Sequence, residues 1–597
     1  MNKSPRSLAD FFTLETALYL LAFTIALALR LLNLGQSPLT DGEASLALQA
    51  LQIAQKGTAT FIPGPYPAHI FLTGATFSIF GAGEFLARLW PALAGTLLVF
   101  VPTFFRHELG RKTALVLAFW LAVDPGLVTV SRQVNGPMMA LSFSLLALGL
   151  WHTHRPTWAG IFGGLALLSG PAFWQGALGL GLAWLFYRLL LRSAHEPGEV
   201  FDETNEEAVF PTRTDTLRWL VMFITTILVV GTYFFRYPQG LTAIVASLTT
   251  YLEGWTTLSG VSPMTLIIVL LTFQPLAMIF ALVSLGRWLA RRLKYEVDGR
   301  YTLLLPLLWL LTSLIQTLIY PARQVNDLAW VLVPLLVIAA DGLSEYLPED
   351  EPHIISWLQA GLILVLAVLF WNTLIATSQV VPQGNLPRPV IQLGILLGII
   401  LLGVLTTALV ALGWSWQISR DGLVWGLTAA FAIYCTSMLW GSTQLRPNEP
   451  HELWGIPPGP GQEQLALGTL TDLSNWQVGL EDKIDIVSTV DTPSMRWALR
   501  NFSEARFIPE LSPGEMPSVI ITPRSAETPA LTAAYRGQDF VWWVRPAWDG
   551  PLPEDFINWL TFRKAALGND YIILWARGDL FPGGAVDDSN IEPQIAP

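Results

Sequence analysis

Residues 14–44 read LETALYLLAFTIALALRLLNLGQSPLTDGEA. The run from Leu14 to Leu32 is apolar and long enough to cross a hydrocarbon layer of roughly 30 Å. No small-residue cleavage pattern follows it, so we interpret it as a first membrane span and signal anchor rather than a cleaved signal peptide. Two carboxylates, Asp41 and Glu43, come directly after this span in the first loop. The stretch therefore predicts both a membrane fold and a place for chemistry beside it.

The rest of the chain repeats the pattern of the first span. Its 597 residues are 52% hydrophobic and 13% charged, and the mean hydropathy is +0.48. These features predict a mainly α fold, a polytopic membrane bundle of about 13 transmembrane helices. The spans are expected at residues 14–33, 87–105, 113–130, 137–151, 157–173, 175–191, 217–235, 264–285, 302–320, 328–343, 354–375, 390–413 and 421–440.

Loop charges predict the orientation of the bundle. With a cytoplasmic N-terminus, the loops between spans that carry most of the basic residues all lie inside, as the positive-inside rule requires. The densest inner cluster is Arg287, Arg291, Arg292, Lys294 and Arg300. We therefore expect a protein of the cytoplasmic membrane, in contact with membrane lipids, whose C-terminal region is extracytoplasmic. The first outside loop is residues 34–86, and its apolar segment from His69 to Phe80 is too short to cross and is expected at the interface.

The polar parts of the chain lie in three segments. Residues 193–215 are acidic and without apolar periodicity, which predicts a flexible cytoplasmic linker between two spans of the membrane domain, residues 1–440. Strand-like and helix-like segments alternate over residues 441–582, which predicts a soluble, extracytoplasmic α/β domain with a largely parallel sheet. Residues 583–597 are expected to be a disordered tail. The net charge of −11 argues against a nucleic-acid partner.

The first-loop acids have a structural and a functional interpretation. Thr40-Asp41-Gly42-Glu43 has the form of a capping box, in which the side chains of Thr40 and Glu43 each accept a hydrogen bond from the other's backbone N–H. Asp41 lies where the helix dipole favours a negative charge. The same carboxylates are also the first candidates for acid and base chemistry in so apolar a chain. The residues alone leave both interpretations open.

Several further motifs accompany the acids in the N-terminal half. The sequence from residue 14 to about residue 340 resembles the GT-C membrane glycosyltransferases, and especially the protein O-mannosyltransferase and aminoarabinose transferase superfamily in its flippase-associated prokaryotic branch. The resemblance rests on the acid motif with its alanine-rich helix, Pro67-Ala68-His69, Phe80-Gly81, Glu84 to Leu89, Pro91 to Gly95, Gly110-Arg111-Lys112, Pro125, Ser131-Arg132, Tyr237 to Gly240 and Pro263. In the C-terminal domain, Pro493 to Arg500 is similar to a tryptophan and arginine segment of the same branch.

This resemblance implies transfer of a sugar from a polyprenyl-phosphate donor to a glycan, lipid or protein acceptor on the outer face. It implies that Glu43 and Asp41 form the acid site, which acts as a general base or binds a divalent cation, and that Arg132 holds the donor phosphate. No cofactor is certain. Arginine suits phosphate because its planar fork binds two oxygens at once. The topology adds Arg88, Lys56 and Arg323 as further phosphate ligands, and His69 as a candidate for acid-base work.

Two departures from the family pattern keep an alternative open. Gly42 separates Asp41 from Glu43, where the family has adjacent acids, and Asn135-Gly136-Pro137 stands where it has a second acid. Asp124, near the outer end of the third span, is the candidate to replace that second acid. The alternative function is a non-catalytic membrane protein that binds lipid-linked glycans or scaffolds envelope assembly. A transporter is placed lower, because no paired broken helices with buried charges are apparent.

Overall fold

A computed structural model of the chain describes residues 13–55, 63–134, 136–194, 212–294, 303–347, 353–378, 387–443, 445, 452–454, 459–512, 514–524, 533–548, 550 and 552–581. Contacts divide the chain into two compact units, each made of segments that are not contiguous in sequence. The larger unit contains residues 1–36, 49–455 and 548–565, and the smaller contains residues 37–48, 456–547 and 566–597. Most of the predicted linker at residues 193–215 and the predicted tail at 583–597 lie outside the described residues.

The larger unit is helical and spans a membrane several times. Within the described residues, seven helices are long and apolar enough to cross, or ten if each of three bent helix pairs is one span. Its helices are α1 (Leu14–Leu31), α2 (Asp41–Ala54, shared with the smaller unit), α3 (Pro67–Phe80), α4 (Glu84–Leu97), α5 (Val101–Phe104), α6 (Arg106–Leu109), α7 (Arg111–Val123), α8 (Pro125–Ser131), α9 (Met138–His152), α10 (Pro156–Leu167), α11 (Pro171–Ala194), α12 (Arg213–Gly231), α13 (Thr242–Glu253), α14 (Pro263–Phe273), α15 (Pro275–Lys294), α16 (Leu304–Ile319), α17 (Ala329–Ser344), α18 (Ile354–Ser378), α19 (Pro387–Gly413), α20 (Trp416–Ser442) and α23 (Phe556–Phe562).

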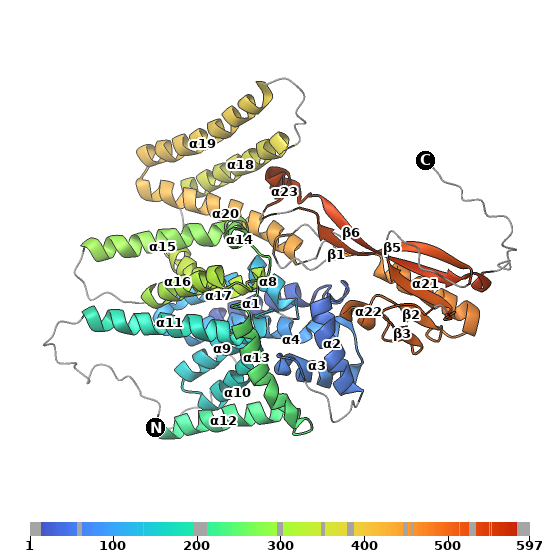
Figure 1. Cartoon of the computed structure of the whole chain (residues 1–597). Helices are drawn as coiled ribbons and strands as arrows, with labels where there is room; N and C mark the ends of the chain where they lie inside the picture. Colours follow the sequence, from blue (N-terminus) through green and yellow to red (C-terminus); the bar gives the residue numbers. More distant parts are fainter. Residues whose placement is uncertain are drawn as a thin grey trace. The chain divides into compact units, whose positions relative to one another are not determined.

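The prediction of a mainly α membrane bundle is confirmed, and each predicted span coincides with a helix or a bent pair of helices (Figure 1). Proline sets the bends. Pro125 begins α8 after a turn of 54° from α7, and Pro275 begins α15 after a turn of 87° from α14. A proline has no backbone N–H for the preceding helix to use and restricts the residue before it, so one helix ends there and another starts.

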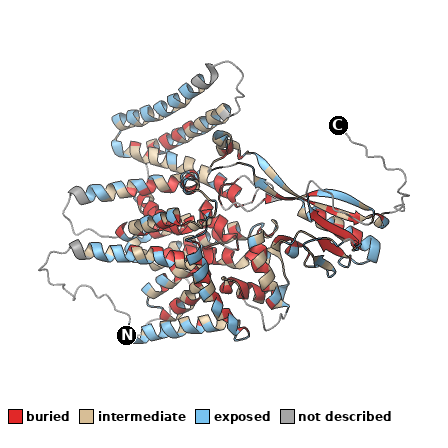
Figure 2. Ribbon diagram, in the orientation of Figure 1, coloured by how far each residue is buried: buried red, intermediate tan, exposed pale blue. Residues whose placement is uncertain are grey.

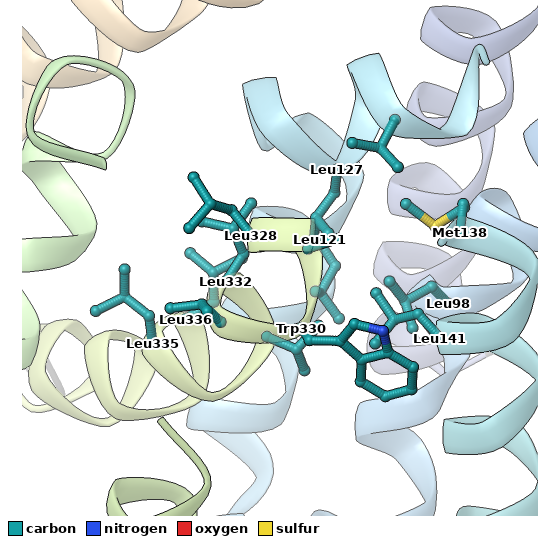
Figure 3. Close-up of a cluster of buried hydrophobic side chains, with 14 of the residues drawn as sticks. Leu98, Leu121, Leu127, Met138, Leu141, Leu328, Trp330, Leu332, Leu335 and Leu336 are labelled. Carbon is teal, nitrogen blue, oxygen red and sulfur yellow. The ribbon is translucent and has the colours of Figure 1, made fainter. Parts of the chain in front are cut away.

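The core of this unit lies around α17, which continues the 3-10 helix η5 (Val325–Leu328). Within Val325–Ser344, 78% of an 18-residue apolar window is buried, whereas only 6% of such a window within Ile391–Gly413 of α19 is buried. Figure 2 shows this difference between a buried α17 and an exposed α19. Figure 3 shows Trp330 and Leu332 of α17 among leucines from α7, α8 and α9. An exposed apolar helix in a membrane protein faces lipid, so α19 needs no polar face.

The smaller unit is an α/β domain built on one six-stranded sheet (Figure 1). Its strand order is β1-β5-β6-β4-β2-β3, and two helices accompany the strands. The elements are β1 (Gly459–Pro460), α21 (Glu463–Val478), β2 (Ile486–Ser488), α22 (Pro493–Ala498), β3 (Ala505–Phe507), β4 (Val519–Pro523), β5 (Tyr535–Pro546) and β6 (Leu567–Arg577).

The prediction of a largely parallel sheet is wrong. Among the strands that the structure describes, only β2 pairs in parallel, with β3 and β4, whereas β1–β5, β5–β6 and β6–β4 are antiparallel. The strand-helix-strand pattern of residues 535–577 suggested a parallel crossover, in which the helix covers the sheet. Instead α23, between β5 and β6, belongs to the membrane unit, where Trp559 is fully buried. With no helix to carry the chain across the sheet, β5 and β6 pair as a long antiparallel ribbon.

Candidate functional site

Glu43 is held in place by the capping box at the start of α2. The Thr40 N–H donates to Glu43 Oε2 at 3.2 Å, and the Glu43 N–H donates to Thr40 Oγ1 at 3.4 Å. Glu43 is only 3% exposed. A reciprocal cap of this kind satisfies two helix N-terminal donors and fixes the carboxylate in one orientation. The structural interpretation of Glu43 is therefore correct, and it leaves the carboxylate in a defined, nearly dry position.

Asp41 contacts the C-terminal domain rather than its own helix. The backbone N–H of Ser494, the second residue of α22, donates to Asp41 Oδ1 at 3.0 Å. Both residues belong to the smaller unit, because residues 37–48 group with the sheet and not with the membrane helices on either side. The loop that carries the predicted acid site is thus a part of the C-terminal domain in structure, although the sequence places it between the first two spans.

Two of the predicted phosphate ligands lie at the C-terminal end of α1. Arg132 Nη1 donates to the carbonyls of Leu29, Arg30 and Leu32 at 3.0, 3.2 and 2.7 Å. Arg88 Nη1 donates to the carbonyl of Leu34 at 3.3 Å. The last carbonyls of a helix have no partners within it and carry partial negative charge, so cations are favourable there. The two guanidinium groups lie close enough to each other to interact electrostatically.

Arg30 is a third cation in this cluster, which the sequence reasoning did not single out. Its side chain is fully buried, and its guanidinium donates to the carbonyls of Ala122 and Leu121 at 3.1 and 3.0 Å, at the end of α7. It also lies within electrostatic range of Arg132 and Asp124. A signal was present in the sequence, because an arginine inside an apolar span is rare unless it has a partner or a role.

Asp124 is the N-cap of α8 at the break between α7 and α8. The Leu127 N–H donates to Asp124 Oδ1 at 2.8 Å, and Gln274 Nε2 donates to Asp124 Oδ2 at 2.6 Å. The side chain is fully buried. Oδ1 therefore caps α8, and the bond to Oδ2 joins two helix breaks, α7–α8 and α14–α15. This is the arrangement of a helix-end residue.

Arg323 lies in the loop between α16 and η5. Its Nη1 donates to the carbonyl of Val261 at 2.9 Å. Asn326, in the adjoining η5, donates from Nδ2 to Gln133 Oε1 at 2.6 Å, which joins η5 to the residue after Arg132. The chain beside Arg323 thus contacts the chain beside Arg132.

The two remaining predicted residues have different outcomes. His69 is 2% exposed at the start of α3, and its Nε2 lies 3.4 Å from Thr73 Oγ1. That position fits a buried polar anchor. Lys56 lies outside the described residues. Among the residues that the structure describes, no group of three or more His, Cys, Asp or Glu side chains is arranged to hold a metal ion.

The chain is similar to one family model and to several solved structures. Residues 52–170 match the family model for dolichyl-phosphate-mannose-protein mannosyltransferase. The chain is similar to the crystal structure of ArnT from Cupriavidus metallidurans bound to undecaprenyl phosphate, with a TM-score of 0.50 and 15% identity over 85% of this chain and 93% of that one. The apo state of that ArnT gives a TM-score of 0.49 at 14% identity, over 95% and 99% of the two chains. For the Archaeoglobus fulgidus oligosaccharyltransferase the TM-score is 0.38 at 14% identity, over 82% of this chain and 61% of that one. No curated protein sequence matches the chain.

Proposed function

We propose, from the premise that this multi-pass membrane protein has the GT-C fold, that it is a glycosyltransferase that uses a polyprenyl-phosphate sugar donor. The observation that carries the proposal is the likeness in fold, along most of both chains, to ArnT in complex with undecaprenyl phosphate. The match of residues 52–170 to a family whose donor is a dolichyl phosphate sugar supports the same donor class. Both lipids present a phosphate group at the membrane surface.

In this proposal Glu43 is the general base on the acceptor hydroxyl. A hydroxyl is a weak nucleophile until a positioned carboxylate takes its proton. The bonds between Thr40 and Glu43 orient the carboxylate at the start of α2. The low exposure of Glu43 keeps water away from it.

The arginines at the end of α1 hold the donor phosphate in this proposal. All three hydrogen bonds that Arg132 makes among the described residues use Nη1. Its Nε and Nη2 are the pair that presents two parallel donors to a phosphate. Arg88 and Arg30 add positive charge close by, and Arg323 lies on a neighbouring loop. Cationic donors fixed before the reaction stabilise the lipid phosphate as its negative charge develops.

In this proposal the reaction takes place on the outer face of the cytoplasmic membrane, an orientation that the loop charges favour. The loops that hold Glu43, Arg132 and Arg323 fall on one side of the membrane when the lysine-rich and arginine-rich loops are assigned to the cytoplasm. The acceptor is then a glycan, a lipid or a protein that is accessible from outside. A divalent cation bound by Glu43 would act as a Lewis acid on the same phosphate.

Transfer of sugar from a radiolabelled undecaprenyl-phosphate donor, with purified full-length protein in nanodiscs, tests the proposal. We expect Glu43→Gln to lower turnover about 100- to 10,000-fold, as loss of a general base does. Glu253→Gln, at the exposed end of α13 on the same predicted side, is the matched control and should stay within twofold. Turnover of Glu43→Gln equal to wild type would refute the assignment of the base.

A second function is favoured by one observation: Asp124, the residue expected to serve as a second acid, is fully buried and accepts hydrogen bonds from Leu127 and Gln274. On this alternative the protein binds the donor lipid without transferring its sugar, and serves as a scaffold of envelope assembly. Two results together would support this alternative and refute the enzymatic function. The protein would bind undecaprenyl phosphate saturably, with binding abolished by Arg132→Met, and it would transfer no sugar across a broad panel of glycan, lipid and peptide acceptors.

A further inference from the structure

The contact between Asp41 and α22 assigns a role to the C-terminal domain. We infer that Asp41 is a positioning residue, through which this domain holds the first-loop segment that carries Glu43. The inference rests on the proposed function where it predicts sugar transfer, and on geometry alone where it predicts how the loop and α22 depend on each other.

The N-terminus of α22 is complete only with Asp41. Its first residue, Pro493, has no N–H, and its third, Met495, donates to Oγ1 of Thr492 at 3.3 Å. The Arg496 N–H donates to the carbonyl of Thr492 at 2.9 Å. That leaves the N–H of Ser494, and Asp41 Oδ1 accepts it at 3.0 Å. Because Ser494 is only 3% exposed, water has little access to replace the carboxylate if it is removed.

The helix that Asp41 caps is fixed in the core of the C-terminal domain. Met495 and Ala498 pack in the same apolar cluster as Ile486 of β2 and Val519 of β4, and all four side chains are at most 5% exposed. A bond from Asp41 to the first turn of α22 therefore ties the start of α2 to a rigid sheet. Glu43 is two residues away on that first turn of α2, so the bond limits where its carboxylate can lie.

A cap and a general base need different chemistry from the same residue. A cap needs an oxygen acceptor, which asparagine supplies almost as well as aspartate. A general base needs a group that takes up a proton near neutral pH, which an amide does not. Asp41→Asn keeps the cap and removes the base, whereas Asp41→Ala removes both, so the two substitutions separate the roles. The change Glu43→Gln removes the proposed general base and leaves the cap of α22 in place.

The experiment measures two quantities on the full chain, with wild type, Asp41→Asn, Asp41→Ala and Glu43→Gln. One is amide hydrogen exchange of residues 493–499. The other is sugar transfer from undecaprenyl-phosphate donors. We expect Asp41→Ala to speed exchange at the start of α22 about 5- to 150-fold, which is the cost of an unsatisfied buried donor, and to lower transfer at least tenfold. Asp41→Asn should keep both quantities within about threefold of wild type.

The remaining outcomes decide between the roles. Glu43→Gln should abolish transfer with no change of exchange in α22. If Asp41→Asn is as inactive as Glu43→Gln while α22 keeps its protection, Asp41 acts through its charge and the inference fails. If Asp41→Ala leaves exchange in α22 unchanged, the contact does not hold the loop and the inference fails as well. If wild type transfers no sugar, the proposed function fails, but the exchange of α22 in Asp41→Ala still tests the contact.

Discussion

Removing the guanidinium of Arg563 should destabilise the membrane unit at a site far from the first loop in sequence. Arg563, just after α23, and Glu452 form an ion pair with 3.3 Å between Nε and Oε1, and the two side chains are only 6% and 10% exposed. The guanidinium also lies 4.0 Å from the ring centre of Trp559 and 5.5 Å from that of Phe273. The change Arg563→Met keeps the aliphatic volume and removes the Arg563 cation from the buried Glu452 carboxylate.

The expected cost follows from burial. Breaking one side of a buried ion pair costs about 3–5 kcal/mol, and a desolvated cation over an aromatic face contributes about 2 kcal/mol more. We expect the unfolding midpoint to fall on the order of 5 °C or more. Arg545→Met is the matched control, because Arg545 also forms an ion pair, with Asp570, but the two side chains are 58% and 46% exposed. An exposed pair contributes about 0–1 kcal/mol.

The chain supplies its own probe for this measurement. Cys435, in α20, is its one cysteine and is partly buried. A thiol-reactive fluorophore added during heating therefore reports when α20 opens. Glu452→Met combined with Arg563→Met should regain at least half of the lost midpoint, because no uncompensated charge is then buried. A midpoint of Arg563→Met equal to that of Arg545→Met would refute the reasoning, as would a double variant that loses the sum of both single losses.

Three further predictions follow from local geometry. Gly126→Ala should cost about 1–3 kcal/mol in thermal unfolding, since a Cβ there would lie 2.6 Å from Leu332 and Trp454 side-chain atoms, whereas Gly398→Ala, with nothing within 4 Å, should cost nothing measurable. Thr40→Val should lower the free energy of local opening of α2, measured by amide hydrogen exchange, by about 1 kcal/mol, whereas Thr40→Ser should keep the wild-type value. A hydrogen bond from the Arg496 guanidinium lowers the pKa of Asp491, so the stability that the pair adds is present above the ordinary aspartate pKa of about 3.9 and is lost as the pH falls toward the lower folded value. Between about pH 5 and 3 the free energy of unfolding should therefore fall by a few tenths of a kcal/mol less in Asp491→Asn than in wild type, as measured by tryptophan fluorescence.

Most of the membrane architecture was predictable because it follows from local rules. Long apolar runs mark spans. The breaks at Pro125 and Pro275 were not predicted, and they divide the spans expected at residues 113–130 and 264–285 into two helices each. The sheet was predicted incorrectly, because the periodicity of residues 554–566 identifies a helix but not the surface on which it packs. Trp559 is buried in the membrane unit, and no local pattern in the sequence says so.

The sequence identified candidate residues of the site, but it did not predict the contacts that they make with distant parts of the chain. The capping box of Thr40 and Glu43 could be read from four consecutive residues, and the structure has it. The bond between Asp41 and Ser494 joins residues 453 positions apart, and no spacing rule reaches that far. Arg30 had a readable signal, an arginine inside an apolar run, but which carbonyls it binds depends on where α7 ends.

The grouping of residues 37–48 with the C-terminal domain has a consequence for biosynthesis. This segment leaves the ribosome long before the residues it packs with, which begin at about residue 456. At 5–20 residues per second, translation of the intervening chain takes on the order of 20 to 80 s. During that time the helices are inserted while the acid loop has no partner to dock on. A chain truncated before the sheet would therefore make the membrane spans without the support for Glu43, which ties completion of the site to completion of synthesis.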